Sequence, residues 1–355
     1  MGKIRVAIIG AGGYGGCGAI EILHRHPDAE IVQLVDITGI GRKISEIHPH
    51  LRGLVDLKIR SFEEFQRDGV EEADVALFAT PDGVSQQYAP YLLGKGVKVI
   101  DYSGDFRFRN LGQYEEYAKR IGRKEGHESP QLLERSTYGL PEIHRDEIAR
   151  AELVGNPGCF AVSIILGLAP VVKDHLIDTE NIICDSKTGV SGAGKRPSPA
   201  FHYPARHESI NAYRIGGHQH VIEMEKELYE ISNIPIKLTF TPHVIPISRG
   251  IYSTIYCKKR SSIKKEDIIS LYKDSYKDSP FVKIWDGDTP PSTMDVRFSN
   301  YCRIHIDEDS HTDTLIIISV IDNLVKGQAG NAIQNMNIMF GLPEDMGLSY
   351  PPQYP

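Results

Sequence analysis

The sequence predicts an α/β protein of two domains, in which a doubly wound parallel sheet is followed by an α+β domain with a mixed sheet. Three observations support this prediction. Short apolar runs alternate with helical patterns through about the first hundred of the 355 residues, which is typical of a parallel sheet with helices on both faces. A glycine cluster directly follows the first run. Beyond about residue 170, long loops separate the strand-like runs, which indicates a different architecture.

The first part of the chain contains the runs expected of the parallel sheet. They are rich in Val, Ile and Leu and occupy residues 4–9, 31–36, 74–80 and 97–101. A helical pattern at 19–23 follows the glycine cluster, and the polar stretch 110–150 predicts loops and helices. A further strand at 153–156 leads through a Pro-Gly turn into an apolar helix that begins at Cys159.

The second part of the chain has strand-like runs of a different spacing. They occupy residues 182–185, 237–240, 251–256 and 315–320. Long loops and a few helical patterns lie between them, so we expect an α+β domain. A last helix is predicted at about 328–340, before a proline-rich tail.

Composition and charge exclude several classes of protein. The 47 acidic and 40 basic residues give a net charge of −7, which provides no support for a nucleic-acid or anionic-membrane partner. No apolar run reaches the roughly 18–20 residues of a membrane span. The chain starts with a strand-like segment instead of a signal peptide, and its five cysteines are scattered without a Cys-x-x-Cys pair. We therefore expect a cytoplasmic protein with reduced thiols.

The segment Gly10-Ala11-Gly12-Gly13-Tyr14-Gly15 matches the pattern G-x-G-x-x-G. It follows a strand-like run and opens a helix, which is the context that a dinucleotide-binding loop requires. The first glycine permits the tight turn, the second lets the backbone approach a pyrophosphate, and the third lets the helix pack on the strand. The N–H groups at the helix N-terminus then face the phosphates. The sequence thus predicts a Rossmann-type domain whose cofactor contacts lie in this motif.

Asp36 ends the second strand-like run, 21 residues after Gly15. An acidic residue at that place usually binds the ribose hydroxyls of the adenosine and repels a 2′-phosphate, so it favours NAD over NADP. Arg42 and Lys43 follow closely and could compensate the charge. Both cofactors therefore stay open.

Cys159 stands where a strand, a Pro-Gly turn and a helix meet. A helix N-terminus stabilises a thiolate through its dipole and its N–H groups, and a thiolate attacks a carbonyl carbon far better than a thiol does. None of the other four cysteines has such a context. We therefore predict Cys159 as a nucleophile and regard the other cysteines as small core residues.

The segment from Gly217 to Glu223 supplies two histidines and a carboxylate before a predicted helix. A His-x-His pair could bind a metal ion, but no further ligands suggest themselves, so we predict no metal site. A general acid or base that serves Cys159 is the better interpretation, because a histidine titrates near neutral pH. His218 is the first candidate for this role, ahead of His220.

Two more segments are candidates for anion binding. Gly189–Lys195, which contains Ser191, matches the start of a P-loop, but Arg196 stands where Ser or Thr would bind magnesium, so we exclude a nucleoside triphosphatase. The loop can still hold a phosphate or shape a substrate site. Ser103–Arg107 follows a strand at the sheet edge where ligands collect, and Arg107 could bind a phosphate or carboxylate there. A surface ion pair with Asp105 is the alternative.

Taken together, these motifs resemble the N-acetyl-gamma-glutamyl-phosphate reductase family, a relative of aspartate-semialdehyde dehydrogenase. The resemblance runs nearly end to end, and the Asn-Pro-Gly-Cys and Asp-Asn-Leu-Val-Lys-Gly stretches are its specific parts. The matching segments are Gly10–Gly15, Ser103–Arg107, Asn156–Phe160, Asp185–Arg196, His218–Glu223, Thr241–His243, Arg249–Gly250, Ser299–Cys302 and Asp322–Asn337.

The resemblance implies a role for each matching residue. Cys159 would attack an acyl phosphate and expel phosphate, NAD(P)H would reduce the thioester, and a semialdehyde would leave. His218 would be the acid or base, and Arg107 would hold the phosphate. The resemblance further implies Ser191, Glu223 and Arg249 as substrate-binding residues, and Asn323 as a residue near the nicotinamide.

The resemblance also implies the organisation of the chain. Because the family's last helix packs on the first domain, the dinucleotide-binding domain would comprise 1–158 with 328–355, and a catalytic and dimerisation domain would comprise 159–327. The protein would be a dimer or tetramer acting on a small acyl phosphate in arginine biosynthesis. The family implies NADP, but its NADP-using members usually carry Ser-Arg where this chain has Asp36-Ile37. Phe298 stands where the family usually has Gly.

Three alternatives remain open at this point. A related reductase acts on aminoadipyl or glutamyl phosphate that an acidic carrier protein presents, and the segment 202–204 resembles it, although the net charge of −7 and Phe160 argue against it. A non-catalytic NAD(P)-binding sensor would have no need of a reactive Cys159. A non-phosphorylating aldehyde dehydrogenase would have no use for an anion pocket at Arg107.

Overall fold

The protein was analysed as a computed structural model that describes residues 2–123, 126–260 and 262–354. The chain forms two compact units. Unit 1 comprises Met1–Glu116, Lys124–Gly158 and Gln328–Ser349, and unit 2 comprises Tyr117–Arg123, Cys159–Gly327 and Tyr350–Pro355. Among the described residues, no helix combines the length and the apolar character that crossing a membrane would require.

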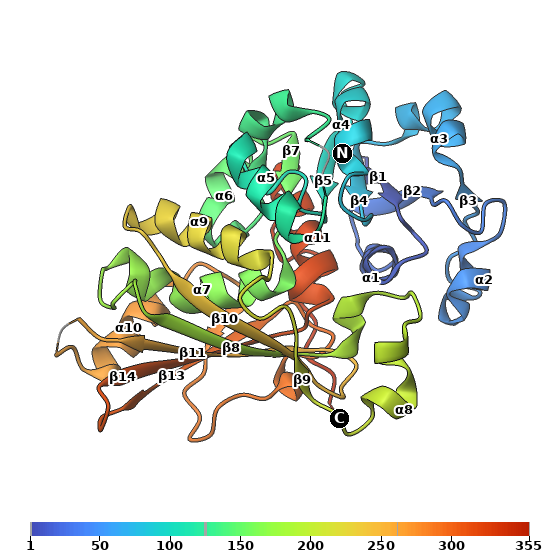
Figure 1. Cartoon of the computed structure of the whole chain (residues 1–355). Coiled ribbons are helices and arrows are strands. Elements are labelled where there is room, and N and C mark those ends of the chain that lie inside the picture. The colour runs from blue at the N-terminus through green and yellow to red at the C-terminus, as the bar shows by residue number, and fades with distance from the viewer. Residues whose placement is uncertain (1, 124–125, 261, 355) are drawn as a thin grey trace. The chain divides into compact units, whose positions relative to one another are not determined.

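Unit 1 contains a seven-stranded sheet in which every strand pairing is parallel (Figure 1). In spatial order its strands are β3 (Ile59–Arg60), β2 (Ala29–Val35), β1 (Ile4–Ile9), β4 (Val75–Phe78), β5 (Lys98–Asp101), β7 (Leu153–Gly155) and β6 (Thr137–Tyr138). The strands β1 and β4 are almost entirely buried, as expected of a sheet that is covered on both faces. This arrangement confirms the predicted Rossmann-type sheet.

The helices of unit 1 are α1 (Tyr14–Leu23), α2 (Ile44–Ile47), α3 (Phe62–Asp68), α4 (Ser85–Gly94), the first part of α5 (Leu111–Arg120), α6 (Pro141–Ile148) and α11 (Gly330–Met339). The helix α1 packs on β1 and β2, whereas α11 packs on α1, α6 and β5. A π-helical turn (Val325–Ala329) precedes α11, which therefore starts slightly later than the predicted residue 328.

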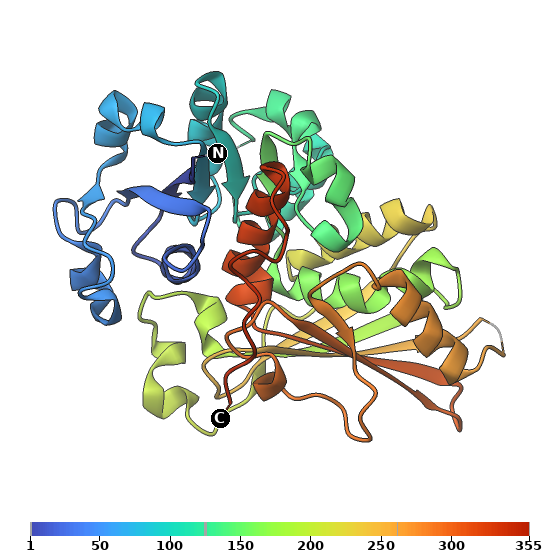
Figure 2. The ribbon, with the colours of Figure 1, turned by 180° about the vertical axis from the view of Figure 1, so that it is seen from behind.

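Unit 2 contains a second seven-stranded sheet, and this one is mixed (Figure 2). Its strands, in spatial order, are β12 (Val282–Ile284), β13 (Cys302–Asp309), β14 (Thr314–Ile321), β11 (Ile251–Lys258), β8 (Ile182–Thr188), β10 (Leu238–Val244) and β9 (Asn211–Ala212). The pairs β12–β13 and β8–β10 are parallel and the others are antiparallel. The predicted mixed sheet is thus confirmed, although the sequence analysis missed the strands β9, β12 and β13.

Helices cover one face of this sheet. They are α7 (Cys159–Lys173), α9 (His220–Ser232) and α10 (Lys265–Ser275), and α7 packs on β11, β14, α9 and α10. The short helix α8 (Tyr203–Arg206) packs on the neighbouring 3₁₀ turn Pro199–Phe201. Along β11 buried residues alternate with half-exposed or exposed ones, which shows that the other face of the sheet is open within the chain.

The observed division differs from the expected one in two segments. Tyr117–Arg123 and Tyr350–Pro355 belong to unit 2, whereas the resemblance assigned both to the dinucleotide-binding domain. Hydrogen bonds within unit 2 account for this. The Arg120 guanidinium donates to the carbonyl oxygen of His218 (3.1 Å), and the N–H of Gln353 donates to the carbonyl oxygen of Arg297 (3.0 Å).

Candidate active site

At Gly10 and Gly16, on either side of the loop between β1 and α1, there is no room for a side chain. A Cβ atom at Gly10 would collide with the carbonyl oxygen of Ala79, and the φ of +87° at Gly10 also favours glycine. A Cβ atom at Gly12 would lie 3.0 Å from a carboxylate oxygen of Asp36. At Gly16, which the predicted motif does not include, it would collide with the carbonyl oxygen of Gly10. The loop therefore offers the bare backbone that a pyrophosphate needs for close approach.

Helix α1 begins at Tyr14 directly after this loop, with Gly13 as its N-cap residue. Among the residues that the structure describes, no side chain caps this helix. The N–H groups of its first turn can therefore bind an anion. The predicted residues Gly10 to Gly15 thus fit a dinucleotide whose pyrophosphate lies on this N-terminus.

Asp36 lies beside the glycine loop, directly after β2. Its Oδ2 atom accepts a hydrogen bond from the N–H of Gly12 (2.8 Å), and its Oδ1 atom accepts from the N–H and the hydroxyl of Thr38 (both 3.0 Å). The structure therefore brings two of the predicted cofactor residues into direct contact and holds the carboxylate in one orientation.

In unit 2, Cys159 is the first residue of the 15-residue helix α7 and is partly exposed. This is the predicted position, in which the helix N-terminus favours the thiolate. Gly327, a residue that the sequence analysis did not single out, packs directly against it. A Cβ atom at Gly327 would lie only 2.8 Å from the Cβ atom of Cys159. The π-helical turn that contains Gly327 thus fixes the place of the thiol.

The cysteines in the sheet of unit 2 are unsuited to nucleophilic attack. Burial raises the pKa of the Cys257 thiol to about 12 and that of Cys184 still further. Cys302 is also fully buried. Their environment supports the prediction that Cys159 is the reactive thiol of this unit.

His218 lies in an aromatic cluster that includes the residue next to Cys159. The centre of its ring is 5.6 Å from that of Phe160 and 5.1 Å from that of Phe240, and both contacts are edge-to-face. Tyr213 packs on the same ring at 5.8 Å. Because Phe160 directly follows Cys159, these contacts hold the two predicted catalytic residues in one cluster.

The protonation of His218 follows from its surroundings. Burial, assisted by the guanidinium groups of Arg214 and Arg120, lowers the pKa of His218 to about 3, so the ring is neutral near pH 7. Its Nδ1 atom accepts a hydrogen bond from the N–H of His220 (3.2 Å). The remaining proton of the neutral ring is thereby assigned to Nε2, which can donate a hydrogen bond. The same geometry engages Nδ1 and argues against a metal ion shared by His218 and His220.

The side-chain amide of Asn323 links two loops of unit 2 that carry predicted residues. The Asn323 amide nitrogen donates to the hydroxyl of Ser191 (3.0 Å), and its oxygen accepts from the N–H of Gly250 (2.8 Å), the neighbour of Arg249. Asn323 is 2% exposed. It therefore joins the loops that carry Ser191 and Arg249. Glu223 is fully buried in the first turn of α9.

Arg249 is held by an acidic and an aromatic neighbour. One of its guanidinium nitrogens lies 3.6 Å from a carboxylate oxygen of the buried Asp322, and the guanidinium lies 4.5 Å from the ring centre of Phe298. Phe298 has a φ of +60°. This left-handed conformation favours glycine, which gives a physical reason for the glycine that the resembling family usually has there.

Arg107 of unit 1 is buried among backbone carbonyl groups. Its Nε atom donates to the carbonyl oxygen of Asn156 (2.8 Å) and one terminal nitrogen donates to that of Tyr102 (2.7 Å). Only 6% of the residue is exposed. These bonds indicate a structural task that the sequence analysis did not foresee, namely to hold the peptide three residues before Cys159. The phosphate-binding role of Arg107 stays a prediction.

Asn156 is fixed from α11 as well. Its side-chain oxygen accepts hydrogen bonds from the amides of Asn331 (2.8 Å) and Asn335 (3.2 Å), and its own amide donates to the carbonyl oxygen of Gln328 (3.1 Å). The sequence analysis placed Asn156 in a specific motif without giving it a task. The structure shows that it ties the Pro-Gly turn to the last helix.

Buried carboxyl groups lie within the Ser103–Arg107 loop and directly before it. Burial and the neighbouring Asp105 raise the pKa of Asp101, and burial together with Asp82 raises that of Asp105. The hydroxyl of Ser103 donates to Asp101 (2.7 Å), whereas the N–H of Gly83 donates to Asp105 (2.8 Å). The alternative of a surface ion pair between Arg107 and Asp105 is not what the structure shows, because Asp105 is fully buried and accepts from Gly83.

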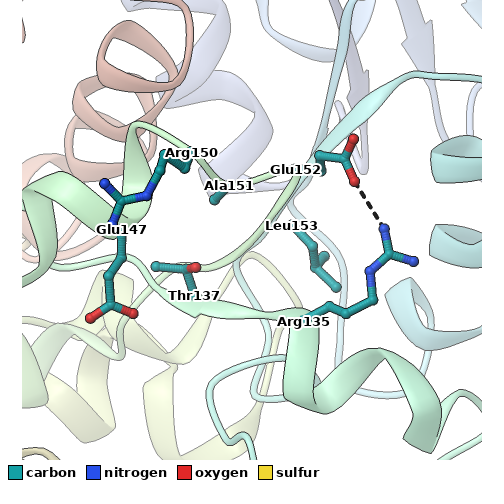
Figure 3. A pocket seen from close by; sticks show the side chains of 7 residues that line it. All are labelled: Arg135, Thr137, Glu147, Arg150, Ala151, Glu152 and Leu153. Atoms are coloured by element: carbon teal, nitrogen blue, oxygen red, sulfur yellow. Dashed lines mark hydrogen bonds and ion pairs between the residues drawn. The ribbon is translucent and has the colours of Figure 1, made fainter.

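A hollow of about 460 Å³ in unit 1 lies apart from the predicted residues. Figure 3 shows that an ion pair between Arg135 and Glu152 (2.9 Å) borders it. Its lining residues are Arg135, Thr137, Glu147, Arg150, Ala151, Glu152 and Leu153. It contains none of the predicted site residues and has no evident chemistry.

One cluster of potential metal ligands was missed by the sequence analysis. Cys17, Glu21 and His50 bring their Sγ, Oε1 and Nε2 atoms within 3.8 Å of one another. His50 and Glu21 already form a hydrogen bond of 2.8 Å. This ion pair with an adjacent thiol accounts for the cluster without a metal ion.

Comparisons with known proteins identify the family. The family model described as "Semialdehyde dehydrogenase, NAD binding domain" matches residues 5–151, and the model described as "Semialdehyde dehydrogenase, dimerisation domain" matches residues 159–323. The N-acetyl-gamma-glutamyl-phosphate reductase of Bacillus mycoides is 42% identical over 353 residues, which is 99% of this chain and 100% of the relative. The chain belongs to the N-acetyl-gamma-glutamyl-phosphate reductase family. The family member of Halothermothrix orenii is 44% identical over 97% of this chain and 98% of its own length.

Solved structures support the same fold at lower identity. Aspartate semialdehyde dehydrogenase II of Vibrio cholerae, complexed with ASA, is similar with a TM-score of 0.73 and 20% identity over 96% of this chain and 99% of its own. The aspartate semialdehyde dehydrogenase of Candida albicans, solved with NADP, has a TM-score of 0.70 and 15% identity, and the match covers 95% of this chain and 98% of the Candida protein. The predicted resemblance is thus confirmed, and a nicotinamide cofactor is supported by the family model.

Proposed function

We propose that this chain reduces N-acetyl-γ-glutamyl phosphate to N-acetylglutamate γ-semialdehyde with release of phosphate, as a step of arginine biosynthesis. One observation carries the proposal. Cys159 opens helix α7 while the ring of the neutral His218 packs on the adjacent Phe160. The names of the relatives, which match over the full chain, supply the substrate.

The chemistry begins with Cys159. Its thiolate attacks the acyl carbon, a C–S bond forms, and the C–O bond to phosphate breaks with the electron pair leaving on phosphate. A bound reduced nicotinamide supplies a hydride to the carbon of the resulting thioester. When the C–S bond then breaks, the semialdehyde leaves and Cys159 regains its thiolate. The N-terminus of α7 stabilises that thiolate before and after the reaction.

We propose that His218 acts at the oxygen atom of the reacting carbonyl group. A neutral ring with its proton on Nε2 donates a hydrogen bond to the oxygen as negative charge develops there. A ring that stays neutral cannot also remove the proton of the Cys159 thiol while Nε2 carries its own proton. The helix N-terminus therefore takes over the activation of the thiol, and His218 stabilises the oxyanion.

The remaining predicted residues are proposed to position the substrate. Ser191, Glu223 and Arg249 would bind it directly, and Asn323 would act through the two loops that it joins. Arg107 would contribute to phosphate binding, and its bond to the carbonyl oxygen of Asn156 would fix the turn before Cys159.

The domain roles and the assembly are part of the same proposal. Residues 1–158 with 328–355, apart from the segments Tyr117–Arg123 and Tyr350–Pro355 that belong to unit 2, would bind the dinucleotide, and 159–327 would carry catalysis and dimerisation. The open face of the sheet in unit 2 carries the cross-strand pair Ile183 and Tyr256, which are 49% and 36% exposed. Apolar side chains on an open sheet face favour burial against a second copy, so a dimer or a tetramer built on this face is proposed. Location in the cytoplasm stays a prediction.

The coenzyme is a nicotinamide dinucleotide, but the family and the residues of this chain differ on its 2′-phosphate. The resemblance implies NADP, whereas Asp36 favours NAD. The reaction as proposed works with either of the reduced forms, because the 2′-phosphate takes no part in hydride transfer.

The reverse reaction tests the proposal. Purified protein is incubated with N-acetylglutamate γ-semialdehyde and NAD or NADP, with and without phosphate, and the reduced cofactor is followed by absorbance. We expect reduction only with phosphate, loss of turnover in Cys159→Ser with cofactor binding retained, and near-normal turnover in the matched control Cys257→Ser. Appreciable turnover of Cys159→Ser, or reduction without phosphate, would contradict the thioester mechanism.

A further inference from the structure

The negative charge at the end of β2 is placed where a dinucleotide would carry its adenosine ribose. Asp36 follows the last residue of β2 directly, and Gly12 of the glycine loop donates to its Oδ2 atom (2.8 Å). In a Rossmann-type sheet the ribose next to the first glycine turn reaches this position. The hydrogen bonds from Gly12 and Thr38 hold the carboxylate beside the loop, so it cannot turn away from an incoming nucleotide without losing them.

The carboxylate can still accept more hydrogen bonds. Each carboxylate oxygen has two acceptor sites, and Oδ2 receives a bond from Gly12 whereas Oδ1 receives two from Thr38. A vacant acceptor site on Oδ2 suits a ribose hydroxyl, which donates. A 2′-phosphate has only acceptor oxygens and close to two negative charges, so beside Asp36 it meets repulsion with no hydrogen bond to offset it.

The cations near this position are engaged with other carboxylates. Arg42 pairs with Glu46 at 3.3 Å, and Lys43 pairs with Asp56 at 3.2 Å. Arg60, whose backbone carbonyl accepts from the N–H of Asp36, directs its guanidinium to Asp68 and to the carbonyl oxygen of Glu64. Exposed pairs of this kind are weak, so the discrimination rests on Asp36, and the ion pairs only reduce the compensation that these cations can provide.

We infer that this chain uses NADH, and that Asp36 is the residue that excludes the 2′-phosphorylated coenzyme. The inference rests on the proposed function only in requiring a nicotinamide coenzyme. It adds a property of this chain that its family membership does not supply, because the relevant contacts are those of Asp36, Gly12 and Thr38 in this structure.

Binding of the coenzyme to the full chain tests the inference without any turnover. NADH and NADPH are titrated into the protein and followed by nucleotide fluorescence, and ADP and 2′,5′-ADP are titrated by calorimetry as probes of the adenosine half alone. We expect NADH to bind about 100-fold more tightly than NADPH, equivalent to about 2.8 kcal/mol. ADP should likewise bind more tightly than 2′,5′-ADP. Equal binding, or tighter binding of NADPH, overturns the inference.

Variants then locate the effect. Asp36→Asn removes the charge at nearly constant shape and should reduce the preference for NADH to less than about tenfold, mainly by strengthening NADPH binding. Glu30→Gln makes the same change of charge at an exposed residue of the same strand, at its other end, and should leave the preference unchanged. If Asp36→Asn has the wild-type preference while its circular dichroism spectrum is native, Asp36 is not the determinant and the inference fails.

The inference and the proposed reaction fail in different ways. Tight NADH binding by a protein that does not oxidise the semialdehyde with phosphate would refute the reaction and support the coenzyme preference. Phosphate-dependent turnover that proceeds faster with NADP than with NAD at equal low concentration would support the reaction and overturn the preference.

Discussion

Replacing Gly327 by alanine adds a single methyl group directly against the proposed nucleophile. The added Cβ atom would lie 2.8 Å from the Cβ atom and 3.3 Å from the Cα atom of Cys159. Carbon atoms that are not bonded make ordinary contact at about 3.5–4.0 Å. Either Cys159 or the π-helical turn must therefore move by roughly 0.7–1.2 Å.

Neither side can move without cost. The N–H of Gly327 donates to the carbonyl oxygen of Asp322 (3.0 Å), and helix α7 is almost entirely buried beyond its first residue. Overpacking of this kind costs about 1–3 kcal/mol of unfolding free energy. A displacement of about 1 Å at a reacting atom can cost roughly 100-fold in rate. We therefore expect kcat to fall by about that factor, while binding of the dinucleotide, whose predicted contacts lie in the glycine loop of unit 1, stays unchanged.

The assay compares the reverse reaction, the rate of Cys159 alkylation by iodoacetamide, and urea unfolding in the variant and the wild type. Gly94→Ala is the control, because a Cβ atom at that helical residue meets nothing within 4 Å. A Gly327→Ala protein with kcat within about twofold of the wild type would show that the π-helical turn does not fix the thiol, and the reasoning from this contact would be refuted.

Three further predictions concern titration and backbone strain. The pKa of His218 is lowered to about 3 from an ordinary 6.5, so its contribution to stability is present above pH 6.5 and is lost as the pH falls toward 3. When urea titrations at pH 6.5 and pH 5 are compared, the wild type should therefore lose about 2 kcal/mol of unfolding free energy more than His218→Gln does. The pKa of Asp101 is raised, so its contribution to the free energy of unfolding is present below its ordinary 3.8 and is lost as the pH rises through the raised value. Asp101→Asn should therefore gain unfolding free energy relative to the wild type from pH 4 to pH 8. A difference between the two proteins that stays constant over this range would contradict the burial of this carboxyl group. The free energy of unfolding of Phe298→Gly should be about 1 kcal/mol higher than that of Phe298→Ala, because both variants lose the ring but only glycine relieves the positive φ. The reverse order of the two free energies would contradict that backbone conformation.

Local patterns made the architecture and the position of Cys159 at the start of a helix predictable. Alternating apolar runs and helical patterns specify a parallel sheet wherever they occur, because periodicity depends only on neighbours in the sequence. Cys159 could be placed at a helix N-terminus for the same reason, since proline and glycine end the preceding strand and the apolar helical pattern begins immediately. The strand β13 has an alternating pattern of the same kind, and the signal was present but not used.

Contacts between distant segments could not be predicted. Arg107 lies at the sheet edge where ligands collect, yet β5 and β7 pair so that the carbonyl oxygens of Tyr102 and Asn156 both face its guanidinium. Asn323 lies 132 residues from Ser191 and still bonds to it. Which donor satisfies which acceptor is decided only when the chain is folded, so the residue types could suggest binding roles but not these structural contacts.

The support of Cys159 shows why such contacts matter for the chemistry. Within unit 1, Asn331 and Asn335 of α11 bind the side chain of Asn156, and within unit 2, Gly327 packs on Cys159. Within unit 1 the last helix thus holds the Pro-Gly turn, and within unit 2 the π-helical turn holds the first residue of α7. A helix N-terminus stabilises a thiolate only while the sulfur stays within its first turn. The contact of Gly327 with Cys159 therefore supports the prediction that this thiol is a nucleophile, because it keeps the first residue of α7 in place.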